Sequence, residues 1–114
     1  QMAPTTLDGQ KSTTCIYGRN PEINGNPVKM CELLSTLTGP AYIARQSLCD
    51  VKHIVQAKKA IKKAFEHQIN GDGFTMVELL SSCPTNWHMT PEQALQYVAG
   101  DMENLYPLGV FKEV

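Results

Sequence analysis

Cys83 lies in the stretch of this sequence with the most chemically useful side chains, Cys83-Pro84-Thr85-Asn86-Trp87. A thiol, an amide and an indole lie close together there, and the ring of Pro84 makes the turn between them rigid. A thiolate serves as a ligand of iron–sulfur clusters and as a nucleophile. Because one cysteine cannot hold a cluster, the stretch alone leaves two interpretations of Cys83: a cluster ligand, or a buried thiol at the end of a strand.

The remaining cysteines and the histidines are not spaced as a metal site. Cys15, Cys31, Cys49 and Cys83 include no Cys-x-x-Cys pair, which excludes a zinc ribbon. We expect free thiols, most of them packing residues, because free cysteine behaves as a small hydrophobe. His88 is close enough in sequence to Cys83 for a Cys–His nucleophile pair, but no third residue that would orient the imidazole is evident.

Gly71-Asp72-Gly73 resembles the start of a thiamine-diphosphate motif, and Asn104 follows at about the right distance. That motif needs its Gly-Asp-Gly after a strand, so that the aspartate meets a metal-bound diphosphate. Here the triplet follows a predicted helix and precedes a predicted strand. We therefore interpret it as a helix stop and a tight turn.

Two predicted strands and one helix position Cys83. Phe74 to Leu80 is a short apolar run between turn residues, which predicts a buried strand, and Ala41 to Leu48 predicts a second one. Between them a helix begins after Asp50 and ends at Gly71. This order predicts an α/β fold with a parallel βαβ unit and a right-handed crossover. Cys83 then lies at the carboxyl edge of the sheet, where α/β proteins bind ligands.

The helix between the strands has the clearest periodicity in the chain. Its predicted buried face consists of Val51, Ile54, Val55, Ile61, Phe65 and Ile69. Lysines at positions 52, 58, 59, 62 and 63 lie largely on the other side. We favour a solvated face for these lysines; the alternative is a docking face for an acidic electron carrier.

The flanking segments complete one predicted domain over residues 1–114. We expect residues 1–26 to form an irregular loop that faces a cofactor or a partner, because this segment is rich in turn residues. We expect residues 27–114 to form the α/β core. Asn26-Pro27 predicts the start of a short helix that runs to about Thr36, and Thr90 with Gln93 has capping-box spacing for another. Residues 106–111 predict an extended apolar tail.

The overall composition excludes several function classes. The 114 residues carry a formal net charge of −1, so no global field favours nucleic acid or an anionic membrane. No apolar run approaches the roughly 20 residues that span a bilayer, and the first residues lack the pattern of a signal peptide. We expect a cytoplasmic protein with no membrane partner.

Five separate motifs resemble, in order, one known protein family. They are Gln1-Met2-Ala3-Pro4-Thr5-Thr6, Tyr17-Gly18-Arg19-Asn20-Pro21-Glu22, Gly39-Pro40-Ala41-Tyr42-Ile43-Ala44-Arg45, Cys83-Pro84-Thr85-Asn86-Trp87 and Tyr106-Pro107-Leu108-Gly109-Val110. The chain is similar to the thiamine-diphosphate-binding (beta) subunit of 2-oxoacid:ferredoxin oxidoreductases. The resemblance covers nearly the whole chain and only the C-terminal part of the family's subunit. The Cys83–Trp87 motif is more similar to the branched-chain 2-oxoacid or 2-oxoglutarate members than to the pyruvate members.

The resemblance implies a thiamin-binding three-layer fold and the oxidative decarboxylation of a 2-oxoacid to an acyl-coenzyme A. It implies thiamine diphosphate, Mg²⁺ and a [4Fe–4S] cluster as cofactors, with ferredoxin, coenzyme A and the other subunits as partners. Cys83 corresponds to the fourth cluster ligand. Gln1, Met2, Ala3, Pro4 and Thr5 correspond to residues beside thiamine diphosphate.

The sequence departs from the family where the cofactors are held. The family's Gly-Asp-Gly, its downstream Asn and its Cys-x-x-Cys pair correspond to positions before Gln1. We therefore expect that this chain alone binds neither thiamine diphosphate nor a cluster, is inactive in isolation and has Cys83 as a free thiol. We also expect it to self-associate, either through an unpaired sheet edge or by swapping of residues 1–26. The alternative is a standalone, non-enzymatic α/β interaction module.

Overall fold

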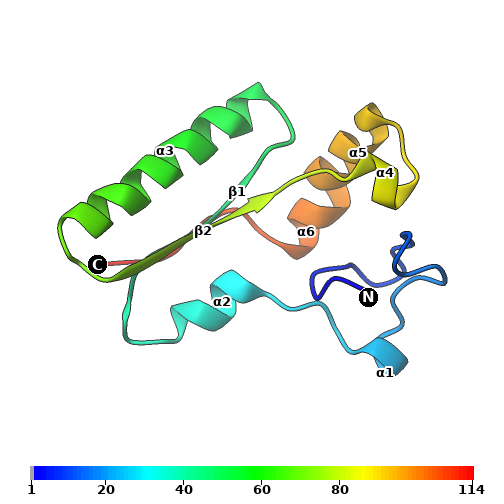
Figure 1. Ribbon diagram of the computed structural model, residues 1–114, viewed down its shortest axis with the longest axis horizontal. Coiled ribbons are helices and arrows are strands. Elements are labelled where there is room, and N and C mark those ends of the chain that lie inside the picture. The colour runs from blue at the N-terminus through cyan, green and yellow to red at the C-terminus, as the bar shows by residue number, and fades with distance from the viewer. Residues whose placement is uncertain (1) are drawn as a thin grey trace.

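A three-stranded mixed sheet forms the centre of the fold in the computed structural model, which describes residues 2–114 (Figure 1). The strands are β1 (Pro40–Ser47), β2 (Phe74–Leu80) and β3 (Gly109–Glu113), in the order β2-β1-β3. β1 and β2 are parallel and are joined by helix α3 (Val51–Ile69), which confirms the predicted α/β class and the βαβ unit. β1 is buried along nearly its whole length.

Two predictions about the strands need correction. β2 was expected to be buried, but it is an edge strand, and most of its residues are half-buried. The apolar run is there because one face of β2 packs against α3. The tail after Tyr106 was expected to be merely extended, but residues 109–113 pair with β1 as an antiparallel strand. β3 is short, and its apolar pattern is too brief to indicate a strand.

Helix α3 covers one face of the sheet. Its start is as predicted, since the side chain of Asp50 accepts a hydrogen bond from the backbone N–H of His53 (2.8 Å), and Gly71 follows its end with a φ of 71°. Its predicted buried face is wrong. Ala57 and Ala60 are its buried residues, whereas Phe65 is 65% exposed.

The correction has a steric reason: small side chains let a helix backbone lie close to a sheet. Of the predicted face, Ile54 and Ile61 are half-buried. The exposed members are Val51, Val55, Phe65 and Ile69. The Gly71-Asp72-Gly73 triplet is the predicted turn, in which Asp72 pairs with His67 at 2.7 Å. A Cβ on Gly73 would lie 2.8 Å from the carbonyl oxygen of Gly39, so this close approach requires glycine.

Helix α2 (Met30–Ser35) lies on the opposite face of the sheet from α3 (Figure 1). Side chains on β1 point alternately to the two faces of the sheet. Tyr42 stacks on His67 of α3 on one face, and Arg45 pairs with Glu32 of α2 on the other. The predicted start of this helix after Asn26-Pro27 is wrong. Val28 instead donates a backbone hydrogen bond to Pro4 (2.9 Å), which keeps this segment extended.

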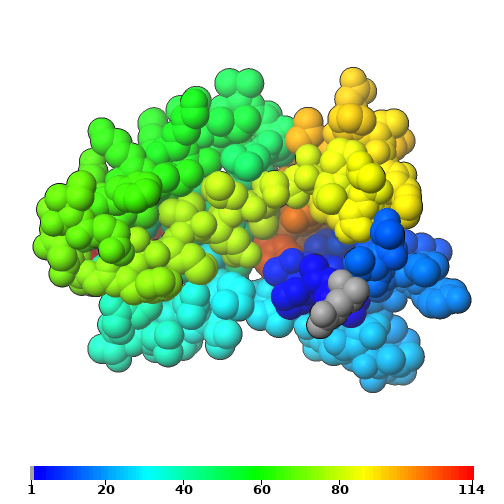
Figure 2. Space-filling model, in the orientation of Figure 1, coloured from blue at the N-terminus to red at the C-terminus, as the bar shows by residue number. Residues whose placement is uncertain are grey.

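Short helices follow β2 and pack against one another beyond its carboxyl end (Figure 1). They are α4 (Pro84–Trp87), α5 (Pro91–Tyr97), the π-helical turn η1 (Val98–Met102) and α6 (Glu103–Leu105). The predicted capping box at Thr90 and Gln93 is confirmed. In Figure 2 the N-terminal loop, in blue, lies between the yellow residues around α4 and the light-blue segment that contains α1 (Pro21–Asn24). No helix within residues 2–114 is both long and apolar enough to cross a bilayer.

Arg45 of β1 connects the sheet to helix α2 through a group of buried ion pairs. Its guanidinium is fully buried and donates two hydrogen bonds to the carboxylate of Glu32 (2.8 and 2.7 Å) and one to Glu78 of β2 (2.8 Å). The rings of Tyr106 and Phe111 lie 5.1 and 4.9 Å from the guanidinium carbon. The hydrogen bonds from Arg45 are the main reason that the pKa of Glu32 is lowered, so this carboxylate stays charged.

Replacing Arg45 with alanine should lower the free energy of unfolding by about 3–5 kcal/mol, because two carboxylates are left close together without their cation. Arg45→Lys should lose less, since lysine keeps the charge but not the forked geometry. Urea unfolding followed by circular dichroism measures both. Lys62→Ala is the matched control, since it removes only an exposed contact to Glu66 at 3.9 Å. Equal midpoints for Arg45→Ala and Lys62→Ala would contradict the prediction.

Candidate functional site

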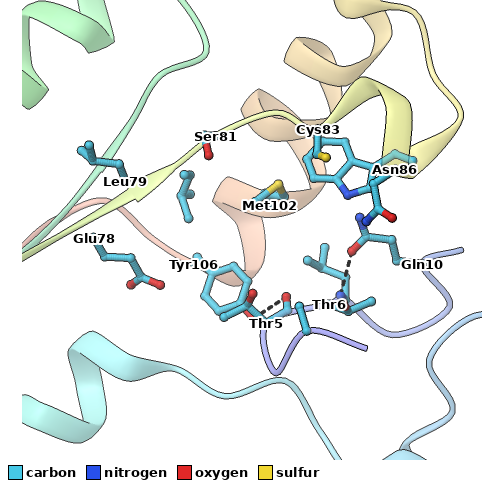
Figure 3. Close-up of a pocket in the computed structure, with 14 residues that line it drawn as sticks. Thr5, Thr6, Gln10, Glu78, Leu79, Ser81, Cys83, Asn86, Met102 and Tyr106 are labelled. Carbon is cyan, nitrogen blue, oxygen red and sulfur yellow. Dashed lines mark hydrogen bonds between the residues drawn. The ribbon is translucent and has the colours of Figure 1, made fainter. Parts of the chain in front are cut away.

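A pocket of about 270 Å³ lies where β2 ends, bounded by the N-terminal loop, α4 and the segment around α6 (Figure 3). The polar and thiol-bearing residues that line it come from three separate parts of the chain. They include Thr5, Gln10, Glu78, Cys83, Asn86 and Tyr106. The pocket is thus at the carboxyl edge of the parallel strands, which is where the sequence predicted a ligand site.

Cys83 lies on the rim of this pocket, between β2 and α4, and it is exposed. Its carbonyl oxygen accepts a hydrogen bond from the backbone of Trp87 (3.0 Å), and Met89 donates to Pro84 (3.0 Å). These bonds close a single helical turn directly after Cys83, so its backbone is fixed while its thiol stays accessible. The structure therefore excludes the interpretation of Cys83 as a buried strand-end thiol.

Part of the predicted cofactor segment lines the same pocket. Ala3 and Thr5 contribute to its wall, and Met2 lines a neighbouring hollow. Pro4 accepts the backbone hydrogen bond from Val28 already described. Gln1 lies outside the described residues. The structure thus brings Ala3 and Thr5 together with Cys83, although they are far apart in sequence, and their role beside a cofactor stays a prediction.

Tyr106 holds the N-terminal loop against the pocket. Its hydroxyl donates a hydrogen bond to the carbonyl oxygen of Thr5 (2.9 Å) across 101 positions of sequence. Arg19 supports the same loop from the other side, because its guanidinium donates to the carbonyl oxygens of Ala3 and Gly25 (2.9 Å each). Sequence reasoning missed both roles. The one signal available was that Tyr106 and Arg19 lie inside the resemblance motifs.

The Asn86–Trp87 corner forms the opposite wall. The backbone of Thr13 donates to the carbonyl oxygen of Asn86 (2.9 Å), and the ring of Trp87 packs edge-on against Tyr97. His88 follows in a left-handed conformation, and its imidazole lies 3.4 Å from the hydroxyl of Thr13. His88 does not line the pocket, so the geometry does not support a Cys83–His88 nucleophile pair.

Glu78 links the pocket to the buried ion pairs. One oxygen of its carboxylate accepts hydrogen bonds from Arg45 (2.8 Å) and from the thiol of Cys31 (3.1 Å). Burial first, and then the contact with Glu78, raise the pKa of Cys31 to about 12, so this thiol stays protonated. Glu78 was not a predicted site residue, because nothing in the spacing of the sequence indicated it.

The pocket contains one thiol that could serve as a ligand of an iron–sulfur cluster. Among residues 2–114, Cys83 is the one cysteine that lines this pocket, and no lysine or arginine of the described chain lines it. Cys31 and Cys49 contact other partners, namely Glu78 and Glu103. A [4Fe–4S] cluster needs four thiolates, and a diphosphate needs cations or backbone donors. The described lining of this pocket therefore supplies one of the four thiolates of a cluster and no cationic side chain for a diphosphate.

Relatives among curated proteins cover nearly this whole chain. It is 46% identical over 113 residues to ketoisovalerate oxidoreductase subunit VorA of Methanothermobacter thermautotrophicus, a match that includes 99% of this chain and 24% of that protein. It is 31% identical to 2-oxoglutarate synthase subunit KorB of Archaeoglobus fulgidus, over 99% of this chain and 42% of that subunit. It is a homologue of 2-oxoacid:ferredoxin oxidoreductase subunits.

These matches confirm the family that the five motifs indicated. A subunit beta of a 2-oxoacid:ferredoxin oxidoreductase from Saccharolobus solfataricus is a further relative, 34% identical over 75% of the chain. The chain spans about a quarter of the length of the ketoisovalerate oxidoreductase subunits. No protein-family model matches the chain, and no solved structure matches it.

The thiols should differ sharply in their reaction with iodoacetamide. Cys83 should react first in the folded protein because it is exposed, and Cys31 last because it is fully buried and its pKa is raised to about 12. Timed labelling followed by peptide mass spectrometry measures the order. In urea all four cysteines should react at similar rates. Labelling of Cys31 as fast as Cys83 in the folded protein would contradict this order.

Proposed function

We propose that this chain acts as part of a 2-oxoacid:ferredoxin oxidoreductase whose substrate is a branched-chain 2-oxoacid. The observation that carries the proposal is the 46% identity to ketoisovalerate oxidoreductase subunits over 99% of the chain. The relatives named for 2-oxoglutarate are 31% and 33% identical, so the branched-chain type is favoured over them.

In the proposed enzyme, a 2-oxoacid is oxidatively decarboxylated to an acyl-coenzyme A, and ferredoxin accepts the electrons. Thiamine diphosphate would supply the carbanion chemistry, and a [4Fe–4S] cluster would carry the electrons. Those cofactors belong to the complete enzyme, together with its other subunits. The chain itself contributes walls of the site and one thiol.

Cys83 is the proposed cluster ligand of this chain. Two features support it: its thiol is exposed on a pocket rim, and its backbone is fixed by the turn that follows. A ligand on a rigid turn needs no reorganisation when a cluster binds. Met2, Ala3, Pro4 and Thr5 are proposed to lie beside thiamine diphosphate, and the hydrogen bond from Tyr106 to Thr5 would hold them there.

The isolated chain should not bind thiamine diphosphate. Its pocket offers no lysine, arginine or unpaired carboxylate to anchor a diphosphate with its magnesium ion, since Glu78 is already paired with Arg45. Isothermal titration calorimetry with thiamine diphosphate and Mg²⁺ should show no binding. Micromolar affinity would prove the prediction wrong. The same titration on the complete complex is the positive control.

The function is tested on the chain in its native complex. A tagged chain expressed in its source cells should co-purify with other oxidoreductase subunits, and the complex should reduce a viologen dye only with a branched-chain 2-oxoacid and coenzyme A. Isolation without such subunits, or a complex without this activity, would overturn the proposal.

A matched pair of variants of the tagged chain tests the role of Cys83. Cys83→Ser should lower the iron content and the cluster signal in electron paramagnetic resonance. Cys15→Ser should leave both unchanged, because Cys15 does not line the pocket that contains Cys83. An active complex in which Cys83→Ser keeps its full cluster signal would refute the ligand assignment and leave the function standing.

A further inference from the structure

A second group of chemically active side chains lies away from the pocket rim, where β1 ends and α3 begins. The thiol sulfur of Cys49 lies 3.4 Å from Nδ1 of His53 and 3.4 Å from a carboxylate oxygen of Glu103. The three atoms all lie within 4.8 Å of one another. The proposed oxidoreductase function uses none of these side chains.

The spacing of the three atoms fits one metal ion. Zinc binds a thiolate at about 2.3 Å and an imidazole nitrogen or carboxylate oxygen at about 2.0–2.2 Å, so a tetrahedral site places its ligand atoms about 3.5 Å apart. The two distances from Cys49 are close to that value. A thiol hydrogen bond can have the same length, so the identity of the donors also matters.

The types of the donors favour a borderline transition metal. Magnesium and calcium select oxygen ligands, whereas a thiolate with an imidazole and a carboxylate suits zinc and cobalt. Cys49 and His53 come from the junction of β1 and α3, whereas Glu103 comes from the C-terminal helices, so the meeting of the three is not the by-product of one helix face.

The start of α3 fixes His53. Asp50 caps the helix by accepting the backbone N–H of His53, and the same oxygen lies 2.7 Å from Nδ1 of the ring. The cap therefore keeps the imidazole in the first turn, next to Cys49 at the end of β1. A second carboxylate thus lies beside the candidate ligands.

Glu103 is turned toward Cys49 by a local irregularity. The π-helical turn Val98–Met102 directly precedes it, and such a turn inserts one residue into the helical path. One residue corresponds to a rotation of about 100° around a helix axis, so the side chains after the turn face a different direction than a continuous α-helix would give them. π-Helical turns are frequent at functional sites.

We propose that Cys49, His53 and Glu103 form a binding site for a zinc-class divalent ion, which joins β1 and α3 to the C-terminal helices. The thiol loses its proton to solvent when the metal–sulfur bond forms, and the imidazole hydrogen moves to Nε2 so that Nδ1 can bind. Asp50 is then freed from Nδ1, and a water molecule from solvent fills the fourth position.

The site is independent of the proposed enzyme function. It contains no residue of the pocket around Cys83, and it would form whichever substrate the complete protein uses. Its predicted effect is structural, because an ion that holds the junction of β1 and α3 to a helix distant in sequence stabilises the folded chain over the unfolded one.

The test uses the whole chain, reduced and freed of metal with a chelator, and then titrated with Co²⁺. Tetrahedral binding through a thiolate gives a sulfur-to-cobalt charge-transfer band in the near ultraviolet, which Zn²⁺ then removes by displacement. Cys49→Ser should abolish the band and weaken Zn²⁺ binding by at least about 100-fold, because the loss of an outer partner alone costs 10–100-fold. Zn²⁺ should also raise the melting temperature of the unaltered chain.

Two further variants separate metal binding from folding. Glu103→Gln keeps the size of the side chain and an acceptor for the thiol, so it should fold as shown by far-ultraviolet circular dichroism and still bind Co²⁺ more weakly. Cys83→Ser should keep the full band. The absence of a band in the unaltered folded chain, its persistence in Cys49→Ser, or its loss in Cys83→Ser would each overturn the proposal.

Discussion

The burial of one positive charge determines how the layers of this protein meet. Arg45 lies in the central strand, with its side chain fully excluded from solvent. A buried guanidinium is tolerated only when its donors are satisfied and its charge is balanced. Burial by itself lowers the pKa of Arg45, but the hydrogen bonds that its guanidinium donates to Glu32 and Glu78 outweigh it and raise the pKa overall. Helix α2 and strand β2 are therefore both tied to β1.

The same residue connects the sheet to the pocket. Tyr106 lies against the guanidinium of Arg45 with its ring and reaches Thr5 with its hydroxyl. Glu78 pairs with Arg45 and also lines the pocket wall. A change at Arg45 thus reaches the pocket at two places, at Glu78 directly and at Thr5 through Tyr106. The position of the N-terminal loop therefore depends on a charge that the loop does not touch.

Sequence reasoning succeeded where a single local signal decided the structure. The apolar runs gave β1 and β2, and the cap at Asp50 with the stop at Gly71 gave α3. It failed where packing decided. The buried face of α3 consists of alanines because the helix lies close to the sheet, and hydrophobicity alone favours the larger side chains that in fact lie outside. β3 depends on pairing with a distant strand, which no short pattern reveals.

The candidate site divides in the same way. Cys83 could be singled out because its residue type, its strand and the proline after it all lie together. Its meeting with Ala3 and Thr5 was indicated by family resemblance alone, since no periodicity connects such distant residues. Cys49 and His53 are four positions apart, yet they indicated nothing, because the third member of the cluster comes from the far end of the chain.

The hydrogen bond between Tyr106 and Thr5 has a consequence for the order in which the chain folds. It closes a loop of 101 positions, so the entropy of that closure must be overcome before the contact contributes any stability. The βαβ unit requires only contacts within residues 40–80 and can form earlier. During synthesis the contact between Thr5 and Tyr106 therefore forms only after the segment around Tyr106 has left the ribosome.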